Sequence, residues 1–378
     1  MPGNHNGLSW NGAFASLQSV LPLATTGDTV LVADGTYKPT STTDRTARFA
    51  LRGGATFLGG YAGYGAPNPS ARDTTLYPTI LSGEIGSAGT TADNSYHVLL
   101  LGSGTGIVDG FTISGGHANG TANHYDLGGA IGMPEQDMLW MLNIVSFQIS
   151  NCIFRDNFAI TGGAVGNSQS CTFTNCLFIN NSATSGGALG GGSGRFINCT
   201  FFDNSAVNGG AISVYNSSPF FLNGRFVGNS ATAGGVVYVQ PSTGNITPTF
   251  TNCDLVANSS GIGTGGVLYN NATSSTPAFS NCIAWDNGGT PFVRSNGNLF
   301  VAQITCCDIQ GGSLIGSGNI NADPQFVRTP TSTDLGDMHL LSTSPCIDVG
   351  NVSATGLTGT ATLTDFDGQP RFTDIPSV

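Results

Sequence analysis

Residues 151–164 read Asn-Cys-Ile-Phe-Arg-Asp-Asn-Phe-Ala-Ile-Thr-Gly-Gly-Ala, and this segment decides the fold because the chain repeats it. Gly-Gly pairs followed by Ala or Val begin at residues 128, 162, 186, 209, 234 and 265. Four of these pairs lie five residues after an Asn that closes a Phe-x-x-Asn. Repetition every 23 to 29 residues predicts a stacked array, in which each unit buries its apolar side only against its neighbours.

The repeated unit indicates strands rather than helices. Its Cys and Phe positions are two residues apart, so both side chains point to the same side of a strand, and we expect that side to be inward. No helical spacing of apolar residues persists through a unit. Crossovers between parallel strands are right-handed in nearly all cases. The sequence therefore predicts an all-β protein, a single-stranded right-handed parallel β-helix with three strands per coil.

Stacking of identical positions predicts two ladders. An inward Cys ladder is expected to comprise Cys152, Cys176, Cys199, Cys253 and Cys282. An Asn ladder is expected at one corner, where Asn tolerates left-handed backbone angles and amides can bond along the stack, comprising Asn157, Asn181, Asn204, Asn229, Asn258 and Asn287. Side chains that stand parallel fit the disulfide dihedral poorly, so we expect free thiols, with a bridge between Cys306 and Cys346 as an alternative.

The pattern divides the chain into three parts. Residues 1–26 are expected to form an N-terminal cap, which includes an amphipathic helix within residues 9–21. The β-helix is expected to span residues 27–322, with an insertion loop at residues 117–143. Residues 323–378 would form closing coils that look truncated.

Composition excludes some classes of function. Only 9% of the residues are charged, the net charge is −11, and no basic run is present. Binding of nucleic acid or anionic lipid depends on clustered Lys and Arg, so we expect neither. The longest strongly apolar run, residues 138–145, is too short to span a bilayer, and we expect no membrane insertion.

The repeats resemble the polymorphic outer-membrane-protein repeats of bacteria, whose units carry Gly-Gly-Ala-Ile/Leu/Val and Phe-x-x-Asn. The flanks, such as Gly27-Asp28-Thr29-Val30 and Asp323-Pro324-Gln325-Phe326, are similar to secreted bacterial β-helix proteins of the pectate-lyase-like superfamily. The resemblance implies an exported protein of the bacterial cell surface. Met1-Pro2-Gly3 begins no signal peptide, so we expect that an export signal was removed. The group contains adhesin-like proteins, lyases and glycosidases, so no single activity is implied.

The first catalytic candidates lie beside the predicted Asn ladder. They are Arg155, Asp156 and Asp203, with the two aspartates two coils apart. Two coils correspond to about 9.6 Å at the backbone, near the separation of the carboxyl groups in inverting glycosidases. The alternative is that these outward side chains are simply solvated.

The predicted insertion loop holds further candidates. Glu135 and His124 could act as acid or base, and Tyr125 and Trp140 could stack on a sugar. Trp285, within a repeat unit, is another binding candidate. The alternatives are contact with another chain and plain packing of the loop on the helix flank.

A metal site is a weaker hypothesis. Asp365 and Asp367 form part of an EF-hand-like Asp-x-Asp-Gly, but the later ligands are absent. A turn stabilised by aspartate is the alternative. We expect no cofactor, with Ca²⁺ as the one ion that these aspartates could bind.

Two functions remain open. One is a rigid binding or structural module, adhesin-like, that contacts a polysaccharide or a surface protein along its flank. The other is a polysaccharide lyase or glycoside hydrolase. The chain has one lysine and two glutamates, which is few for a catalytic cleft, so the binding module is favoured.

Overall fold

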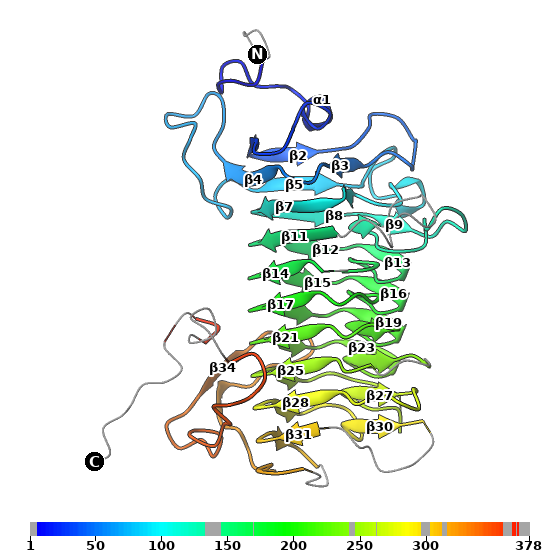
Figure 1. The fold of residues 1–378 in the computed structure, drawn as a ribbon, viewed down its shortest axis with the longest axis vertical. Helices are drawn as coiled ribbons and strands as arrows, with labels where there is room; N and C mark the ends of the chain where they lie inside the picture. Colours follow the sequence, from blue (N-terminus) through cyan, green and yellow to red (C-terminus); the bar gives the residue numbers. More distant parts are fainter. Residues whose placement is uncertain are drawn as a thin grey trace.

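The protein is a long parallel β-helix whose coils stack along one axis (Figure 1). The computed structural model describes residues 6–132, 145–168, 170–241, 246–261, 263–295, 303–311, 316–357, 365–367 and 369. The predicted all-β parallel architecture is confirmed. Within the described residues no helix is long and apolar enough to cross a membrane.

Two ten-stranded parallel sheets form adjoining faces of the helix. Sheet A contains β1 (Thr29–Ala33), β4 (Thr56–Tyr61), β7 (Gly104–Asp109), β11 (Val145–Ser150), β14 (Thr172–Thr174), β17 (Arg195–Ile197), β21 (Phe220–Leu222), β25 (Thr249–Thr251), β28 (Ala278–Ser280) and β31 (Gln303–Thr305). Sheet B contains β2 (Gly35–Tyr37), β5 (Thr79–Ser82), β8 (Phe111–Ser114), β12 (Ile153–Arg155), β15 (Leu177–Ile179), β18 (Thr200–Phe202), β22 (Arg225–Val227), β26 (Asp254–Val256), β29 (Ile283–Trp285) and β32 (Asp308–Ile309).

The remaining face is divided at the Gly-Gly pairs. Before the pairs lie β9 (His117–Ala118), β13 (Phe158–Thr161), β16 (Ser182–Ser185), β19 (Ser205–Asn208) and β23 (Ser230–Ala233). On the other side lie β3 (Phe49–Leu51), β6 (Leu99–Leu101), β10 (Ile131–Gly132), β20 (Ile212–Val214), β24 (Val237–Val239), β27 (Leu268–Asn270) and β30 (Phe292–Arg294). A coil thus carries a fourth short strand, between the Asn and the Gly-Gly. The prediction of three strands per coil did not include this strand.

Each Gly of the Gly-Gly pair is required for a different steric reason. Gly162 has φ of +65°, in the left-handed region that favours glycine. A Cβ on Gly163 would lie 2.2 Å from the carbonyl oxygen of Gly187 in the next coil. The pair therefore permits both the bend and the close approach of successive coils.

The predicted Asn ladder is confirmed, and all of its residues are buried except Asn287, which is half-buried. In it, Nδ2 of each Asn donates to Oδ1 of the next, at 2.9 to 3.0 Å, from Asn157 through to Asn287. Each Oδ1 also accepts the backbone N–H of the preceding Asn, as in Asn181 to Asn204 at 3.1 Å. We call this set the buried ladder. The left-handed backbone angles expected for these Asn residues are not found there. The residue that precedes each Asn takes them instead, as at Asp156, Asn180 and Asp203.

Aromatic columns fill the interior. Phe154, Phe178, Phe201 and Phe226 stack from sheet B at ring-centroid distances of 4.7 to 4.8 Å. A second column stands on sheet A and meets the first edge to face, comprising Phe173, Phe196, Phe221, Phe250 and Phe279. Offset and edge-to-face contacts are the favoured geometries of aromatic pairs, so the columns fix the spacing of the coils.

The inward thiol ladder is also confirmed. Its five predicted cysteines are buried, Cys307 extends it, and all nine cysteines are free thiols. Each ladder thiol donates to backbone carbonyls, as Cys199 Sγ does to Phe173 at 3.5 Å. The alternative bridge between Cys306 and Cys346 is not formed, because the Cys346 thiol instead donates to Asp308.

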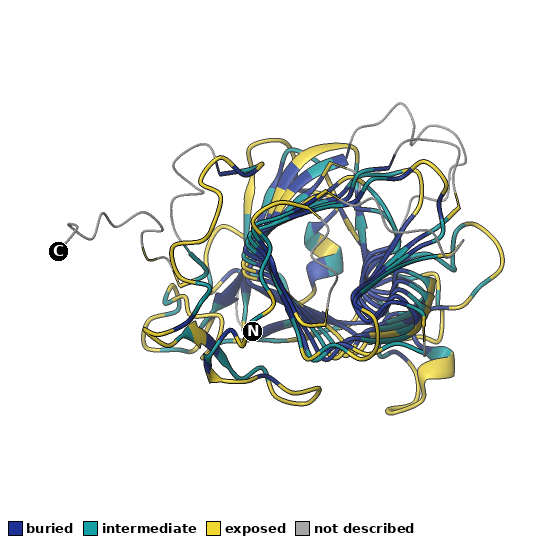
Figure 2. Cartoon of the chain, turned by 90° about the horizontal axis from the view of Figure 1, so that it is seen from below, coloured by how far each residue is buried: buried dark blue, intermediate teal, exposed yellow. Residues whose placement is uncertain are grey.

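The N-terminal cap contains a shorter helix than predicted. Helix α1 covers only Leu17–Val20 rather than most of residues 9–21, where turns precede it. Leu17 and Leu21 are buried in the main core. Seen along the axis, α1 lies across the end of the coils (Figure 2). A single turn is enough to cover the first coil, whose edge would otherwise be open.

Removal of one amide from the buried ladder should destabilise the protein strongly. Asn204 accepts from Asn181 and donates to Phe178 and Asn229, all within the interior. Asn204→Ala leaves these groups unpaired, so we expect a loss of about 3 kcal/mol in the free energy of unfolding, measured by urea denaturation. Asn175→Gly, at an exposed position with φ of 53°, is the control and should cost less than about 1 kcal/mol. Equal losses would contradict this account.

Thiol labelling tests the sealed core. Cys306 and Cys346 are half-buried, and burial together with Asp308 raises the pKa of Cys346 to about 12. We therefore expect one fast and one slow thiol in the native protein and nine after denaturation, counted with a chromogenic thiol reagent. Fast reaction of a third native thiol would show that the ladder is open to solvent.

Candidate functional site

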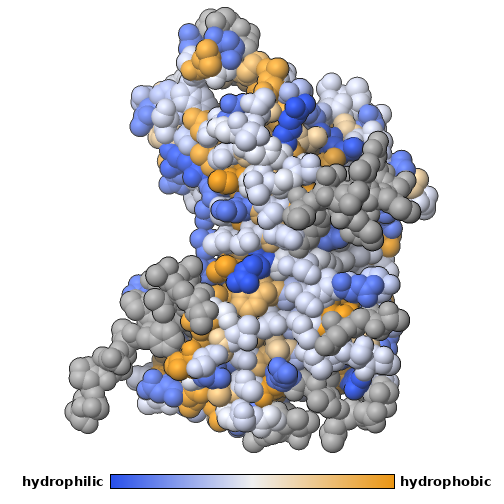
Figure 3. Space-filling model, viewed as in Figure 1, coloured by the Kyte–Doolittle hydropathy of each residue, from blue (hydrophilic) through white to orange (hydrophobic). Residues whose placement is uncertain are grey.

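A C-terminal module packs on the outside of the lower coils. Its antiparallel hairpin, β33 (Phe326–Arg328) and β34 (Asp337–Leu340), places Phe326 and Met338 against Val227 and Val256 of sheet B. The segment that follows places Ala354 and Leu357 against Leu222 of sheet A. Hydrophobic residues gather where this module meets the coils (Figure 3). The module therefore straddles the corner at which sheets A and B meet.

A groove of about 670 Å³ lies between the module and that corner. We call it the corner groove. Its floor is formed by the coils and its walls by the module. Residues that supply polar groups are Asn223, Arg225, Asn252, Asp254, Asn281, Cys306, Asp308, His339, Cys346, Asp348, Asn351, Asp365 and Asp367.

The floor belongs to a second amide ladder that the sequence analysis did not identify. In the repeats, sheets A and B join through a two-residue bend, which is Asn-Cys except for Asn-Gly at residues 223–224. The Asn takes left-handed angles, with φ of 52° at Asn151 and 54° at Asn223. Nδ2 of each bend Asn donates to Oδ1 of the one before it, at 2.9 to 3.5 Å. This corner ladder comprises Asn151, Asn175, Asn198, Asn223, Asn252 and Asn281.

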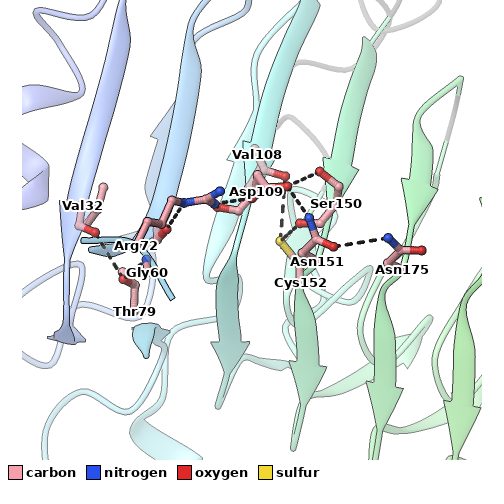
Figure 4. Close-up of polar contacts among 11 residues, drawn as sticks. Val32, Gly60, Arg72, Thr79, Val108, Asp109, Ser150, Asn151, Cys152 and Asn175 are labelled. Carbon is pink, nitrogen blue, oxygen red and sulfur yellow. Dashed lines mark hydrogen bonds and ion pairs between the residues drawn. The ribbon is translucent and has the colours of Figure 1, made fainter. Parts of the chain in front are cut away.

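Asp109 ends the corner ladder (Figure 4). Its carboxylate accepts from Asn151 Nδ2 at 2.7 Å, from Ser150 and from the Arg72 guanidinium. Burial opposes ionisation of Asp109, but the hydrogen bonds from Arg72, Ser150 and Asn151 outweigh it and hold the pKa below its usual value. An anion is favourable here because all the amide N–H groups of the ladder point toward it.

At the other end, the ladder is tied to the module. Asn281 Oδ1 accepts the backbone N–H of Asn351 at 2.7 Å, and its Nδ2 donates to the Asn351 carbonyl at 3.1 Å. Thr251 Oγ1 donates to the Thr355 carbonyl at 2.7 Å. These bonds fix one wall of the corner groove relative to its floor.

Asp308 is the most enclosed carboxyl group of the groove. It is 3% exposed, and its oxygens accept from Ala322 N–H and from the Cys346 thiol at 3.1 Å each. Burial raises the pKa of Asp308 above the usual aspartate value. A carboxyl group in this environment can hold a proton more readily than a solvated one.

Two cations line the groove, and both are engaged. The guanidinium carbon of Arg225 lies 3.7 Å from the centre of the Phe366 ring. The His339 ring binds Asp337 at 2.5 Å and Asp367 at 2.7 Å. The hydrogen bonds that the His339 ring donates to Asp337 and Asp367 raise the pKa of His339 above its ordinary value of 6.5. These contacts hold residues 365–367 beside the hairpin.

The predicted catalytic set on sheet B is not part of the corner groove. Arg155 forms an ion pair with Asp156 at 2.9 Å, and Asn180 in the next coil donates to Asp156 at 2.6 Å. Asp203 lies two coils from Asp156, as expected from the repeat, and the residue is exposed. Loss of part of its solvation raises the pKa of the Asp203 carboxyl group. Asp156 is therefore held by neighbouring side chains, and none of the three residues lines the corner groove.

The other described candidates do not line the corner groove. Tyr125 stacks on Tyr96 at 4.6 Å, which covers one face of its ring, and His124 precedes it in a turn with φ of 59°. Trp285 is half-buried on β29, outside the groove lining. Glu135 and Trp140 lie outside the described residues. Within the expected insertion loop, residues 117–118 and 131–132 form β9 and β10.

The proposed metal pair is engaged in other bonds. Asp365 Oδ1 accepts the backbone N–H groups of Asp367 and Gln369, which is the aspartate-stabilised turn considered as the alternative. Asp367 is paired with His339. In the described part of the chain, no three His, Cys, Asp or Glu side chains come together around a position for a metal ion.

Comparisons with known proteins support the fold. Residues 138–309 match the family model of the right handed beta helix region, which agrees with the predicted hand. Among solved structures, the chain is similar to the crystal structure of pectate lyase Pel9A, with 14% identity, a TM-score of 0.56, and coverage of 97% of this chain and 93% of that one. No curated protein matches the sequence. The chain therefore has a pectate-lyase-like right-handed parallel β-helix fold.

The His339 contacts predict a pH dependence with a definite sign. Because the folded-state pKa is raised, the contribution of the ion pairs to stability is full below pH 6.5 and is lost as the pH rises through the raised pKa. We expect the melting temperature of His339→Gln to approach that of the parent protein as the pH rises. An NMR titration of the His339 ring should show a midpoint above 6.5 that falls in Asp337→Asn. A midpoint unmoved by this substitution would contradict the assignment.

Proposed function

We propose that the protein is a rigid binding module, exported to the surface of a bacterial cell, that holds a glycan in the corner groove. The observation that carries this proposal is the amide floor of a groove large enough for a few sugar rings. The likeness of the repeats to polymorphic outer-membrane proteins and the fold shared with a pectate lyase support an extracellular role. Residues 27–322 would be the rod, residues 1–26 its cap, and residues 323–378 a closing module. A surface protein is the second class of partner for its flanks.

The floor suits hydroxyl groups. Asn252 uses one N–H toward Asn223 and one oxygen lone pair toward Asn281, which leaves one donor and one acceptor for a ligand. Neighbouring Asn residues repeat at the coil spacing of about 4.8 Å, so donors and acceptors alternate along the groove. A linear saccharide presents hydroxyl groups that can donate and accept in the same way.

A second candidate is a glycoside hydrolase that uses the same groove. Asp254 and Asp308 both line it and project from one column of sheet B, with Ile283 of the intervening coil between them. Two coils correspond to about 9.6 Å at the backbone, near the separation typical of inverting enzymes. The raised pKa of Asp308 suits a general acid.

Glycan arrays followed by calorimetry test the binding proposal. Loss of one ligand hydrogen bond at the floor should weaken binding about tenfold, so we expect that effect for Asn252→Gly. Asn175→Gly removes the same group from the same ladder outside the groove, at a residue that bonds to no groove-lining Asn, and should bind as the parent protein does. Equal affinity of the two variants would contradict the proposed site.

Product analysis separates the two candidates. The binding module should release no reducing ends from any bound glycan. Release that disappears in Asp308→Asn would instead establish the hydrolase. Binding without turnover in the parent protein supports the module.

A further inference from the structure

The corner groove is strongly acidic. Among the described residues, five aspartates line it, and the cations that stand among them are Arg225 and His339. The carboxylates are Asp254, Asp308, Asp348, Asp365 and Asp367. Lys38, the only lysine of the chain, does not line it. Even with His339 protonated and Asp308 neutral, the aspartates outnumber the cations.

From this charge we infer that the ligand of the corner groove is a glycan with free amino groups, a hexosamine polymer, rather than a uronate polymer. The inference rests on the proposed glycan-binding function. A uronate would bring a carboxylate into each sugar position and would meet like charges across a few ångströms. An ammonium group would instead find a carboxylate partner in the groove.

Arg225 and His339 do not make the groove favourable for a uronate polymer. Arg225 is stacked on Phe366, and His339 is shared by Asp337 and Asp367, so a uronate would have to break one of these contacts to gain a cation. The chain as a whole has a net charge of −11, which repels a polyanion and attracts a polycation before contact. Local and long-range electrostatics therefore favour the same class of ligand.

Asp348 is the carboxylate that we assign to the ligand amine. It is exposed on the groove wall, has φ of 60°, and makes no hydrogen bond or ion pair with another described residue. Asp308, Asp365 and Asp367, in contrast, accept bonds from the protein. A side chain that is already solvated and unpaired can bind an ammonium group with the least reorganisation.

Calorimetry with four oligosaccharides of equal length and equal linkage tests the inference. These are the glucosamine, N-acetylglucosamine, glucose and uronic-acid forms, at a pH where amine and carboxylates are both charged. We expect the glucosamine form to bind at least tenfold more tightly than the glucose form, and to weaken as salt approaches about 0.15 M. Asp348→Asn should reduce glucosamine binding several-fold and leave the glucose form unchanged. Asp203→Asn, at an exposed carboxylate outside the groove, is the control.

The outcomes are distinguishable. If none of the four forms binds, the proposed function fails. If the glucose or uronate form binds as well as the glucosamine form, with or without added Ca²⁺, the function stands and the inference is overturned. Equal weakening by Asp348→Asn and Asp203→Asn, or full glucosamine binding in Asn252→Gly, would show diffuse attraction to the acidic surface and would also overturn it.

Discussion

The structure depends on one constraint, the in-register stacking of parallel coils at a fixed spacing. The buried ladder enforces this register, because each Asn side chain pairs with the next Asn and with a backbone carbonyl of the preceding coil. A slip of one residue would leave these amides unpaired in the interior, where an unsatisfied polar group costs about 1 to 3 kcal/mol. The Phe columns add attraction that is less specific for register. The polar ladder thus selects the register and the aromatic columns stabilise it.

Two amide ladders run with opposite polarity along the same rod. In the buried ladder, Nδ2 groups point toward the C-terminal end, whereas in the corner ladder they point toward Asp109 near the N-terminal end. The groups at the two ends of the corner ladder fit its polarity. A carboxylate bound by Arg72 accepts at one end of the corner ladder, and the backbone N–H of Asn351 donates at the other. The C-terminal module is therefore bound to the same hydrogen-bonded chain that organises the corner.

The local sequence predicted the features that repeat in every coil. It could not predict the contacts between segments that lie far apart in the sequence. The Phe-x-x-Asn unit gave the fold class, the thiol ladder and the buried ladder, because each is a property of one coil. The Phe column of sheet A went unrecognised although Phe173 and Phe196 each lie two residues before an Asn-Cys. The corner groove was missed because Asn281 and Asn351 meet across 70 residues. Candidates such as Asp156 were chosen for their charge, and the fold gave them local partners rather than a cleft.

The corner Asn joins architecture to the proposed function. The bend needs a residue that tolerates φ near 53°, and Gly or Asn meets that need. Gly would satisfy the backbone alone, whereas Asn also forms the ladder and leaves hydrogen-bonding capacity directed outward. At Asn151, Asn175 and Asn198 that capacity lies outside the groove. Where the module covers the corner, the same amides become the floor of an acidic groove. Binding specificity can therefore be set by the walls, without any change to the repeat that builds the rod.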